Sequence, residues 1–280
     1  MQKTIYNSEN YTSEVRAIFG SIIYEYDIRQ ANINILYSYG LISDFEYQWL
    51  ALAPKQDRQY YIGKKAQMDI HFSTKKKTKS IYNQAISEGV LKARKLLVDT
   101  NGVQEQQVLR AAKDSVYINR PLSLQTTSFD LNNNGRYITF TLRNIFTTYI
   151  RFNSGVILLY GDTANGNNFN VDVKGINDKM IGLHQTFISA LIQITYLCGY
   201  NKTEALKEWQ NVYDDYVHLR CPIDMYREFT SSSGFRYKNH VETKYLELPT
   251  YLPENFDKTK LDITYNLRIL DELYGYIYNT

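Results

Sequence analysis

The sequence predicts an α+β fold, with an antiparallel sheet in the first part of the chain and mainly helices in the second. The stretch from Val108 to Ile118 has two apolar, β-prone ends around a short polar centre, which is the pattern of a tight hairpin. From Met180 to Leu191 one apolar face follows helical spacing instead. We therefore expect a β-containing domain over residues 1–175 and a mainly helical domain over residues 176–280.

Composition and length place the chain among ordinary globular proteins. Its 280 residues are 44% hydrophobic and 22% charged, which is enough to bury a substantial core. Cys198 and Cys221 are too few for a disulfide framework or a thiolate zinc site, which favours a reducing, intracellular setting. The first residues lack the apolar core of a signal peptide, and no apolar run approaches the roughly 20 residues of a membrane span. We expect a cytoplasmic protein without a membrane partner, in the cytoplasm of a host cell if the chain is viral.

The first elements surround a single acid, Asp27. Apolar residues between 15 and 22 have helical spacing, but residues 22–28 are rich in β-forming side chains, so we favour a strand that ends near this acid. Residues 29–39 then fit a helix that ends at Gly40. The capping box Ser43-Asp-Phe-Glu46 predicts a further helix, and Pro54 stops it.

A basic stretch follows between Lys64 and Lys79. It contains one acid, Asp69, and six lysines: Lys64, Lys65, Lys75, Lys76, Lys77 and Lys79. We interpret it either as a solvated loop or as a surface that contacts nucleic-acid phosphates, to which lysines supply sequence-independent attraction. Arg58 with Lys64 and Lys65 could alternatively hold a nucleoside triphosphate. Because the formal net charge is only +3, a nucleic-acid surface has to be a local patch.

The remaining elements change from strands to helices along the chain. Further strands are expected at 137–142, 156–160 and 171–175. Helices are expected at 86–97, from Asn201 onwards and at 263–277. No P-loop, Rossmann glycine pattern or hydrolase Ser motif is present, and the four histidines show no metal-ligand spacing. His184 lies on an apolar helical face and fits a core histidine better than a catalytic base.

Two acids carry the chemistry that the sequence suggests. Asp27 follows one strand and Asp114 sits at the hairpin tip, where paired strands fix the direction of its side chain. Two carboxylates are the minimum for two-metal phosphoryl transfer, and oxygen ligands suit Mg²⁺.

Both acids stand in motifs that resemble family B DNA polymerases. The hairpin VLRAAKDSVYI fits, without a gap, the third palm motif of that family, usually V-L-Y-G-D-T-D-S-V-F-V. Asp114 and Ser115 match this motif, and Ala112 stands at its first acid. Tyr26-Asp27-Ile28 resembles the first palm motif, usually Y-D-x-x-S-L-Y-P, in which the aspartate binds both metals.

Weaker matches follow in the same order along the chain. Ile86-Ser-Glu-Gly89 with Leu91 is similar to the family's I-T-x-x-G-R-x-x-L helix, with one residue missing. Val173-Lys174-Gly175 resembles the V-K-G sequence where the palm passes into the thumb, and residues 219–229 resemble the thumb. The collinearity over roughly residues 22–240 carries the resemblance.

The resemblance implies a polymerase-like palm over residues 1–175, with fingers reduced to about 43–85, and a helical thumb-like domain over residues 176–280. It implies that Asp27 and Asp114 bind Mg²⁺ or Mn²⁺. Lys64 and Lys65 are the best substitutes for the family's triphosphate-binding lysine. Lys174 and the helical domain would grip the duplex minor groove and backbone.

The departures from the family carry their own implications. We expect the family's proofreading exonuclease domain to be missing, because it could not fit ahead of residue 20. The tyrosine that excludes ribonucleotides corresponds to Asn32, so this position could admit a 2′-hydroxyl, which points to RNA priming or ribonucleotide use. Ala112 leaves the site short of one carboxylate. Asp162, in Tyr160-Gly-Asp162-Thr, is a rival for the catalytic acid, but a Gly/Asn loop follows it and we prefer Asp114.

Three functions remain open from the sequence. The first is a template-directed nucleotidyltransferase, a compact polymerase or primase that acts on single-stranded or primer–template DNA with nucleoside triphosphates, of viral or plasmid origin. The second is a non-catalytic, polymerase-derived accessory subunit that binds nucleic acid beside other replication or transcription subunits. The third is a structural protein with an unrelated α+β fold.

Overall fold

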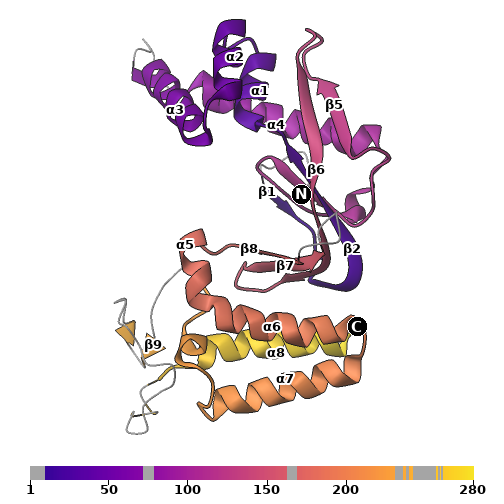
Figure 1. Cartoon of the computed structure of the whole chain (residues 1–280), viewed down its shortest axis with the longest axis vertical. Helices are drawn as coiled ribbons and strands as arrows, with labels where there is room; N and C mark the ends of the chain where they lie inside the picture. Colours follow the sequence, from indigo (N-terminus) through magenta and orange to yellow (C-terminus); the bar gives the residue numbers. More distant parts are fainter. Residues whose placement is uncertain are drawn as a thin grey trace. The chain divides into compact units, whose positions relative to one another are not determined.

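The computed structural model describes residues 10–71, 79–162, 169–230, 236–237, 240–241, 257, 259 and 261–280. The fold is α+β, as predicted, and combines helices with an antiparallel sheet (Figure 1). Within these residues the main sheet has eight strands in the order β1-β3-β4-β2-β6-β7-β8, and β5 pairs with β6.

Contacts within the chain define two compact units. Unit 1 comprises Met1–Glu14 and Ile23–Ile145, and unit 2 comprises Val15–Ile22 and Phe146–Thr280. Strands β2 (Ala17–Ile28) and β6 (Tyr137–Arg151) are long and contribute to both units. The division at residue 175 into palm-like and thumb-like domains stays a prediction.

In unit 1 the predicted hairpin forms, and β2 and β6 continue its sheet. The other strands are β1 (Asn10–Thr12), β3 (Val108–Ala112), β4 (Ser115–Ile118) and β5 (Thr126–Asp130). Side chains alternate between the two faces of a strand, so the neighbours Tyr26 and Asp27 point to opposite faces. Tyr26, Val116 and Phe140 lie in one buried cluster, whereas Asp27 and Ser115 belong to the polar face.

Two helices cover the apolar face of this sheet. They are α1 (Ala31–Ser38) and α4 (Ile81–Thr100), whose Ile35 and Leu97 are fully buried in the same cluster. The helices approach closely at Gly89, where an added Cβ would lie 2.4 Å from Cγ2 of Ile35. The sequence pattern therefore places glycine where no larger residue fits.

The helices α2 (Asp44–Leu52) and α3 (Lys55–His71) complete unit 1. The predicted capping box at α2 is confirmed, since the Ser43 side chain accepts from the Glu46 backbone and the Glu46 side chain accepts from the Ser43 backbone. The interpretation of the region after Lys64 as a loop is wrong for residues 64–71. Ile62 and Ala66 recur at helical spacing and are buried, so this part of the stretch belongs to α3.

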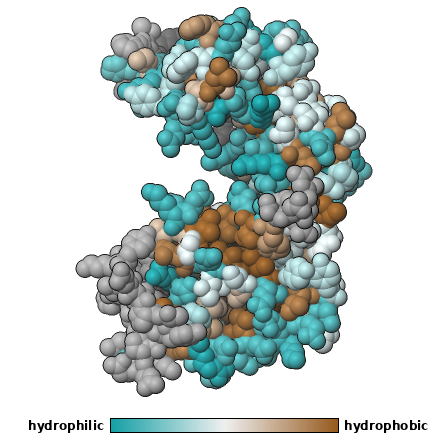
Figure 2. All heavy atoms as spheres, viewed as in Figure 1, coloured by the Kyte–Doolittle hydropathy of each residue, from teal (hydrophilic) through white to brown (hydrophobic). Residues whose placement is uncertain are grey.

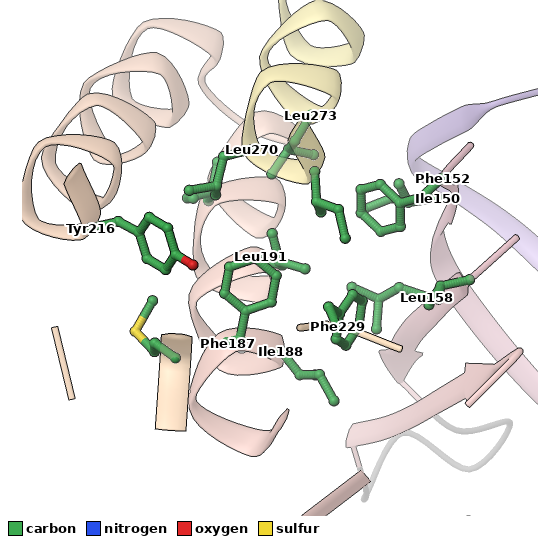
Figure 3. Close-up of a cluster of buried hydrophobic side chains, with 14 of the residues drawn as sticks. Ile150, Phe152, Leu158, Phe187, Ile188, Leu191, Tyr216, Phe229, Leu270 and Leu273 are labelled. Carbon is green, nitrogen blue, oxygen red and sulfur yellow. The ribbon is translucent and has the colours of Figure 1, made fainter. Parts of the chain in front are cut away.

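Unit 2 packs three long helices against the ends of β6 and the hairpin β7–β8. Its further elements are β7 (Ile157–Asp162), β8 (Phe169–Lys174), α5 (Asp178–Ile181), α6 (Gln185–Cys198), α7 (Lys202–Val217), β9 (Arg236–Tyr237), β10 (His240–Val241) and α8 (Thr264–Tyr278). Figure 3 shows Phe187 and Leu191 of α6 between Leu270 of α8 and Leu158 of β7. This interleaving of apolar side chains forms the core of unit 2.

One segment of unit 2, Asp178–Cys198, is long and apolar enough to cross a membrane by length and composition alone. The expectation that no apolar run approaches this length therefore missed it. The buried face of the segment, with Phe187, Ile188 and Leu191, packs in the core that Figure 3 shows. Since a core helix passes the same test, the segment is weak support for a membrane span.

Candidate active site

The structure brings Asp27 and Asp114 to the same end of the sheet in unit 1. Asp27 pairs in register with Ser115, the first residue of β4, and Asp114 occupies the turn just before it. The backbone N–H of Ile28 donates to the Asp114 carbonyl oxygen at 3.0 Å, which ties the turn to β2. The strand end and the hairpin tip therefore lie side by side.

The buried side chain of Arg94 holds the turn that carries Asp114. Lys113 has a positive φ of 51°, a conformation that L side chains adopt rarely and that tight hairpins use. Arg94 of α4 is fully buried, and its guanidinium donates to the Lys113 carbonyl oxygen. A helix packed behind the sheet thus holds the backbone of the turn that carries Asp114.

The carboxylate of Asp27 has two protein partners. The Ser115 hydroxyl donates to Oδ1 at 3.0 Å, and Nη1 of Arg143 on β6 donates to Oδ2 at 3.2 Å. Burial, which is the largest effect, and the negative charge of Asp114 nevertheless raise the pKa of Asp27 to about 6, although the Ser115 hydrogen bond and the charge of Arg143 lower it. The two acids are therefore coupled, and the contact with Arg143 offsets only part of the cost of burying them together.

A third acid, Glu25, lies on the same face of β2 and was missed by the motif comparison. It is almost fully buried and accepts hydrogen bonds from the Tyr117 hydroxyl at 2.7 Å and from the Asn144 side-chain amide at 2.5 Å. The available signal was its alternation with Asp27, because residues two apart on a strand share a face. Each carboxylate oxygen of Glu25 accepts one hydrogen bond, so this acid links β2 to both of its neighbours, β4 and β6.

The donor set at Asp27 and Asp114 fits a hard divalent cation. In phosphoryl-transfer sites Mg²⁺ is bound by one or two carboxylates and keeps water and substrate phosphates as its other ligands. Asp27 and Asp114 supply two carboxylates of this kind, and the charge of Asp114 helps to raise the pKa of Asp27. Within the described residues, no group of three or more His, Cys, Asp or Glu side chains could hold a metal. A cation here would therefore depend on the substrate for part of its coordination.

The residues predicted to hold a triphosphate lie on α3. Lys65 forms an ion pair with Glu46 of α2, and the Tyr61 hydroxyl donates to the same carboxylate at 2.5 Å. The hydrogen bond from Lys65 is the largest of the effects that lower the pKa of Glu46 to about 2. Lys64 lies over the exposed ring of Tyr60, 5.5 Å from its centroid. Arg58 has a buried Nη1 that finds no hydrogen-bond partner among the described residues. Among the residues that the structure describes, Arg58, Lys64 and Lys65 form no ion pair with Asp27 or Asp114.

The other predicted residues are placed as follows. Asn32 is exposed in the first turn of α1, shortly after Asp27. Lys79 is exposed just before α4, and Lys174 pairs with Asp172 at 2.7 Å in unit 2. Lys75, Lys76 and Lys77 lie outside the described residues, as does the side chain of Asp162. His184 is fully buried, as a core histidine should be, and one ring nitrogen lies 3.0 Å from the Thr230 carbonyl oxygen.

Fold and site together define an α+β protein with a coupled carboxylate pair on the polar face of an antiparallel sheet. The chain belongs to the family described as the bacteriophage PBS1 gene 130 protein, whose model matches residues 1–272. No curated protein matches it. One similar solved structure is the family B DNA polymerase from the hyperthermophilic archaeon Pyrobaculum calidifontis, with 10% sequence identity and a TM-score of 0.38. The match covers 95% of this chain and 47% of that chain, so this chain spans about half the length of that polymerase.

Proposed function

We propose that the chain is a template-directed nucleotidyltransferase, a compact polymerase or primase that acts on DNA. The observation that carries the proposal is the pairing of Asp27 and Asp114, two acids that are 87 positions apart in the sequence and electrostatically coupled in the fold. A buried carboxylate whose pKa is raised by burial and by a neighbouring charge, as that of Asp27 is, is more frequent at functional sites than elsewhere on a protein. The resemblance of the two surrounding sequences to palm motifs favours phosphoryl transfer as the reaction.

Asp27 and Asp114 would hold the cations, either Mg²⁺ or Mn²⁺. Such cations, when bound, activate the attacking hydroxyl and stabilise the leaving pyrophosphate. The protein's own side chains orient the ligands: Ser115 holds Oδ1 of Asp27, and Arg94 holds the turn that presents Asp114. Arg143 would release Oδ2 of Asp27 and remain available to a phosphate, since its side chain is largely exposed.

Substrate contacts are assigned by what each side chain already binds. Arg58 is a better candidate for a triphosphate ligand than Lys65, because the charge of Lys65 is already used by Glu46. Asn32, near Asp27 in sequence and exposed, would face the sugar and admit a 2′-hydroxyl. Lys79 and Lys174 are further candidates for contacts with the nucleic-acid backbone.

Labelled-nucleotide incorporation tests this function directly. The protein is supplied with primed and unprimed single-stranded DNA, Mg²⁺ or Mn²⁺, and either ribo- or deoxyribonucleoside triphosphates. Template-dependent product is expected from the wild type and from Asp271→Asn, which changes an exposed acid on α8. Product is expected to be lost in Asp27→Asn and Asp114→Asn. Undiminished incorporation by either of these two variants would exclude the carboxylate pair as the reaction centre.

A second function is favoured by one contact. Arg143 donates to Asp27, so a protein side chain already neutralises one of the two acids, and Ala112 supplies no further carboxylate. This arrangement fits a non-catalytic accessory subunit of a replication or transcription complex that binds nucleic acid through the same fold. DNA binding without any metal-dependent product, under all conditions above, would support this function over the first.

A further inference from the structure

The helix α2 exposes an apolar stripe that the proposed reaction does not use. Phe45, Trp49 and Leu52 are spaced by four and three residues and therefore share one face of the helix. They are 80%, 49% and 90% exposed, although buried apolar side chains are the rule on a helix with an apolar stripe. Two of the three are aromatic rings, which present flat surfaces to solvent.

A second stripe, on α3, combines rings with charge. Tyr60, Lys64 and Met68 are spaced four residues apart, and Tyr60 is 68% exposed. Trp49 of the first stripe contacts α3 through Tyr61, the residue after Tyr60, and the two rings meet edge-on with 5.3 Å between their centroids. Figure 2 shows apolar residues among hydrophilic ones over these helices.

The charges on these two helices leave positive side chains beside the rings. Three of the four acids are engaged within unit 1: Asp44 pairs with Arg136, Glu46 pairs with Lys65, and Asp69 accepts from the Ile81 backbone N–H. The other charged residues of α2 and α3, leaving histidine aside, are Lys55, Arg58, Lys64 and Asp57. The two helices carry equal numbers of acidic and basic side chains. Because three of the acids are engaged by partners, the remaining charged side chains make the surface locally basic.

We propose that this α2–α3 surface binds the unpaired bases of single-stranded nucleic acid. Bases would stack on Phe45, Trp49 and Tyr60, while Lys64 and Lys55 attract the backbone. Exposed rings next to uncompensated cations are the combination that single-strand binding proteins use, because every base has a flat face and every linkage a negative charge. An apolar protein partner would leave these cations against an uncharged surface. This inference rests on the proposed function. It adds that the chain would hold a single strand of nucleic acid on the α2–α3 surface.

Tryptophan fluorescence and oligonucleotide anisotropy test the proposal without nucleotides or divalent metal. Trp49 and Trp209 are the two tryptophans, and Trp209 is nearly buried, with its indole N–H bonded to the Leu270 carbonyl oxygen at 2.8 Å. A deoxythymidine 20-mer is expected to quench the emission of Trp49. We expect the Kd to rise about 10-fold in each of the variants Phe45→Ala, Trp49→Ala and Tyr60→Ala. This change lies within the range of binding free energy that one stacking ring contributes.

The matched control is Tyr200→Ala, which removes a ring of similar exposure, 79%, from unit 2 and is expected to leave the Kd unchanged. Lys64→Gln is expected to lower the salt dependence of binding. Circular dichroism verifies that these surface variants fold. Wild-type affinity in the three ring variants, or an unquenched Trp49 in the complex, would overturn the inference. Because the reaction plays no part in binding, an inactive protein that shows the quenching would contradict the proposed function alone.

Discussion

Replacing Asp27 with asparagine is expected to make the protein more stable at neutral pH. Burial and the charge of Asp114 raise the pKa of Asp27 from 3.8 to about 6. A shift of roughly two units corresponds to about 3 kcal/mol at about 1.4 kcal/mol per unit. The folded state bears this cost only when Asp27 is ionised, and an asparagine of the same shape cannot ionise.

The sign of the effect follows from proton binding. Between pH 3.8 and about 6 the folded state holds the Asp27 proton that the unfolded state has lost, so stability falls as pH rises through this window. Above the window the full cost of about 3 kcal/mol is present. Asp27→Asn should therefore gain up to this amount at pH 8 and almost nothing at pH 4.

Urea denaturation at pH 4 and pH 8, followed by tryptophan emission, measures both values. The control is Asp130→Asn, since the carboxylate of Asp130 accepts from the backbone N–H groups of Asn134 at 3.1 Å and Gly135 at 2.7 Å. This control is expected to lose stability at pH 8. An Asp27→Asn variant that is less stable than the wild type at pH 8, or shifted equally at both pH values, would refute the coupled carboxylate pair.

Three further predictions concern the frame around the site. Gly89→Ala is expected to lower stability by about 1–3 kcal/mol in thermal unfolding, because its Cβ would overlap an isoleucine of α1. Glu46 keeps its ion pair above pH 4.5 and loses it as pH falls towards about 2, so Lys65→Met should cost about 1 kcal/mol at pH 7 and little at pH 2. Tyr117→Phe removes a donor from buried Glu25 and is expected to cost about 1–3 kcal/mol in urea unfolding, whereas an unchanged midpoint would show that water replaces the hydroxyl.

Local signals in the sequence were sufficient for most elements near the site. The hairpin at 108–118, the strand that ends at Asp27 and the capping box of α2 are each specified by a few neighbouring residues, and the structure has all three. These signals depend on alternation and capping chemistry, which act over short distances. The positions of Asp27 and Asp114 then follow from strand pairing.

The polar network around the acids could not be predicted in the same way. Arg143 and Asn144 are more than 110 positions from their partners on β2, and no local pattern marks them as ligands. The length of β6 was also underestimated, because its second half alternates poorly once it becomes buried on both faces. Likewise, the lysines of residues 64–71 hid the helical repeat of Ile62 and Ala66 in α3.

The electrostatics of the pair bear on the choice between the active and the inactive function. Arg143 and Ser115 both contact Asp27, yet its pKa remains about two units above the ordinary value. These contacts therefore do not offset the free energy needed to bury Asp27 beside Asp114. A protein that used this fold only for binding would gain stability by losing either acid. A cation that binds the folded pair more tightly than the unfolded chain would offset the cost through its binding free energy. Mg²⁺ or Mn²⁺ should therefore stabilise the wild type but not Asp27→Asn, and equal stabilisation of both proteins would favour the non-catalytic function.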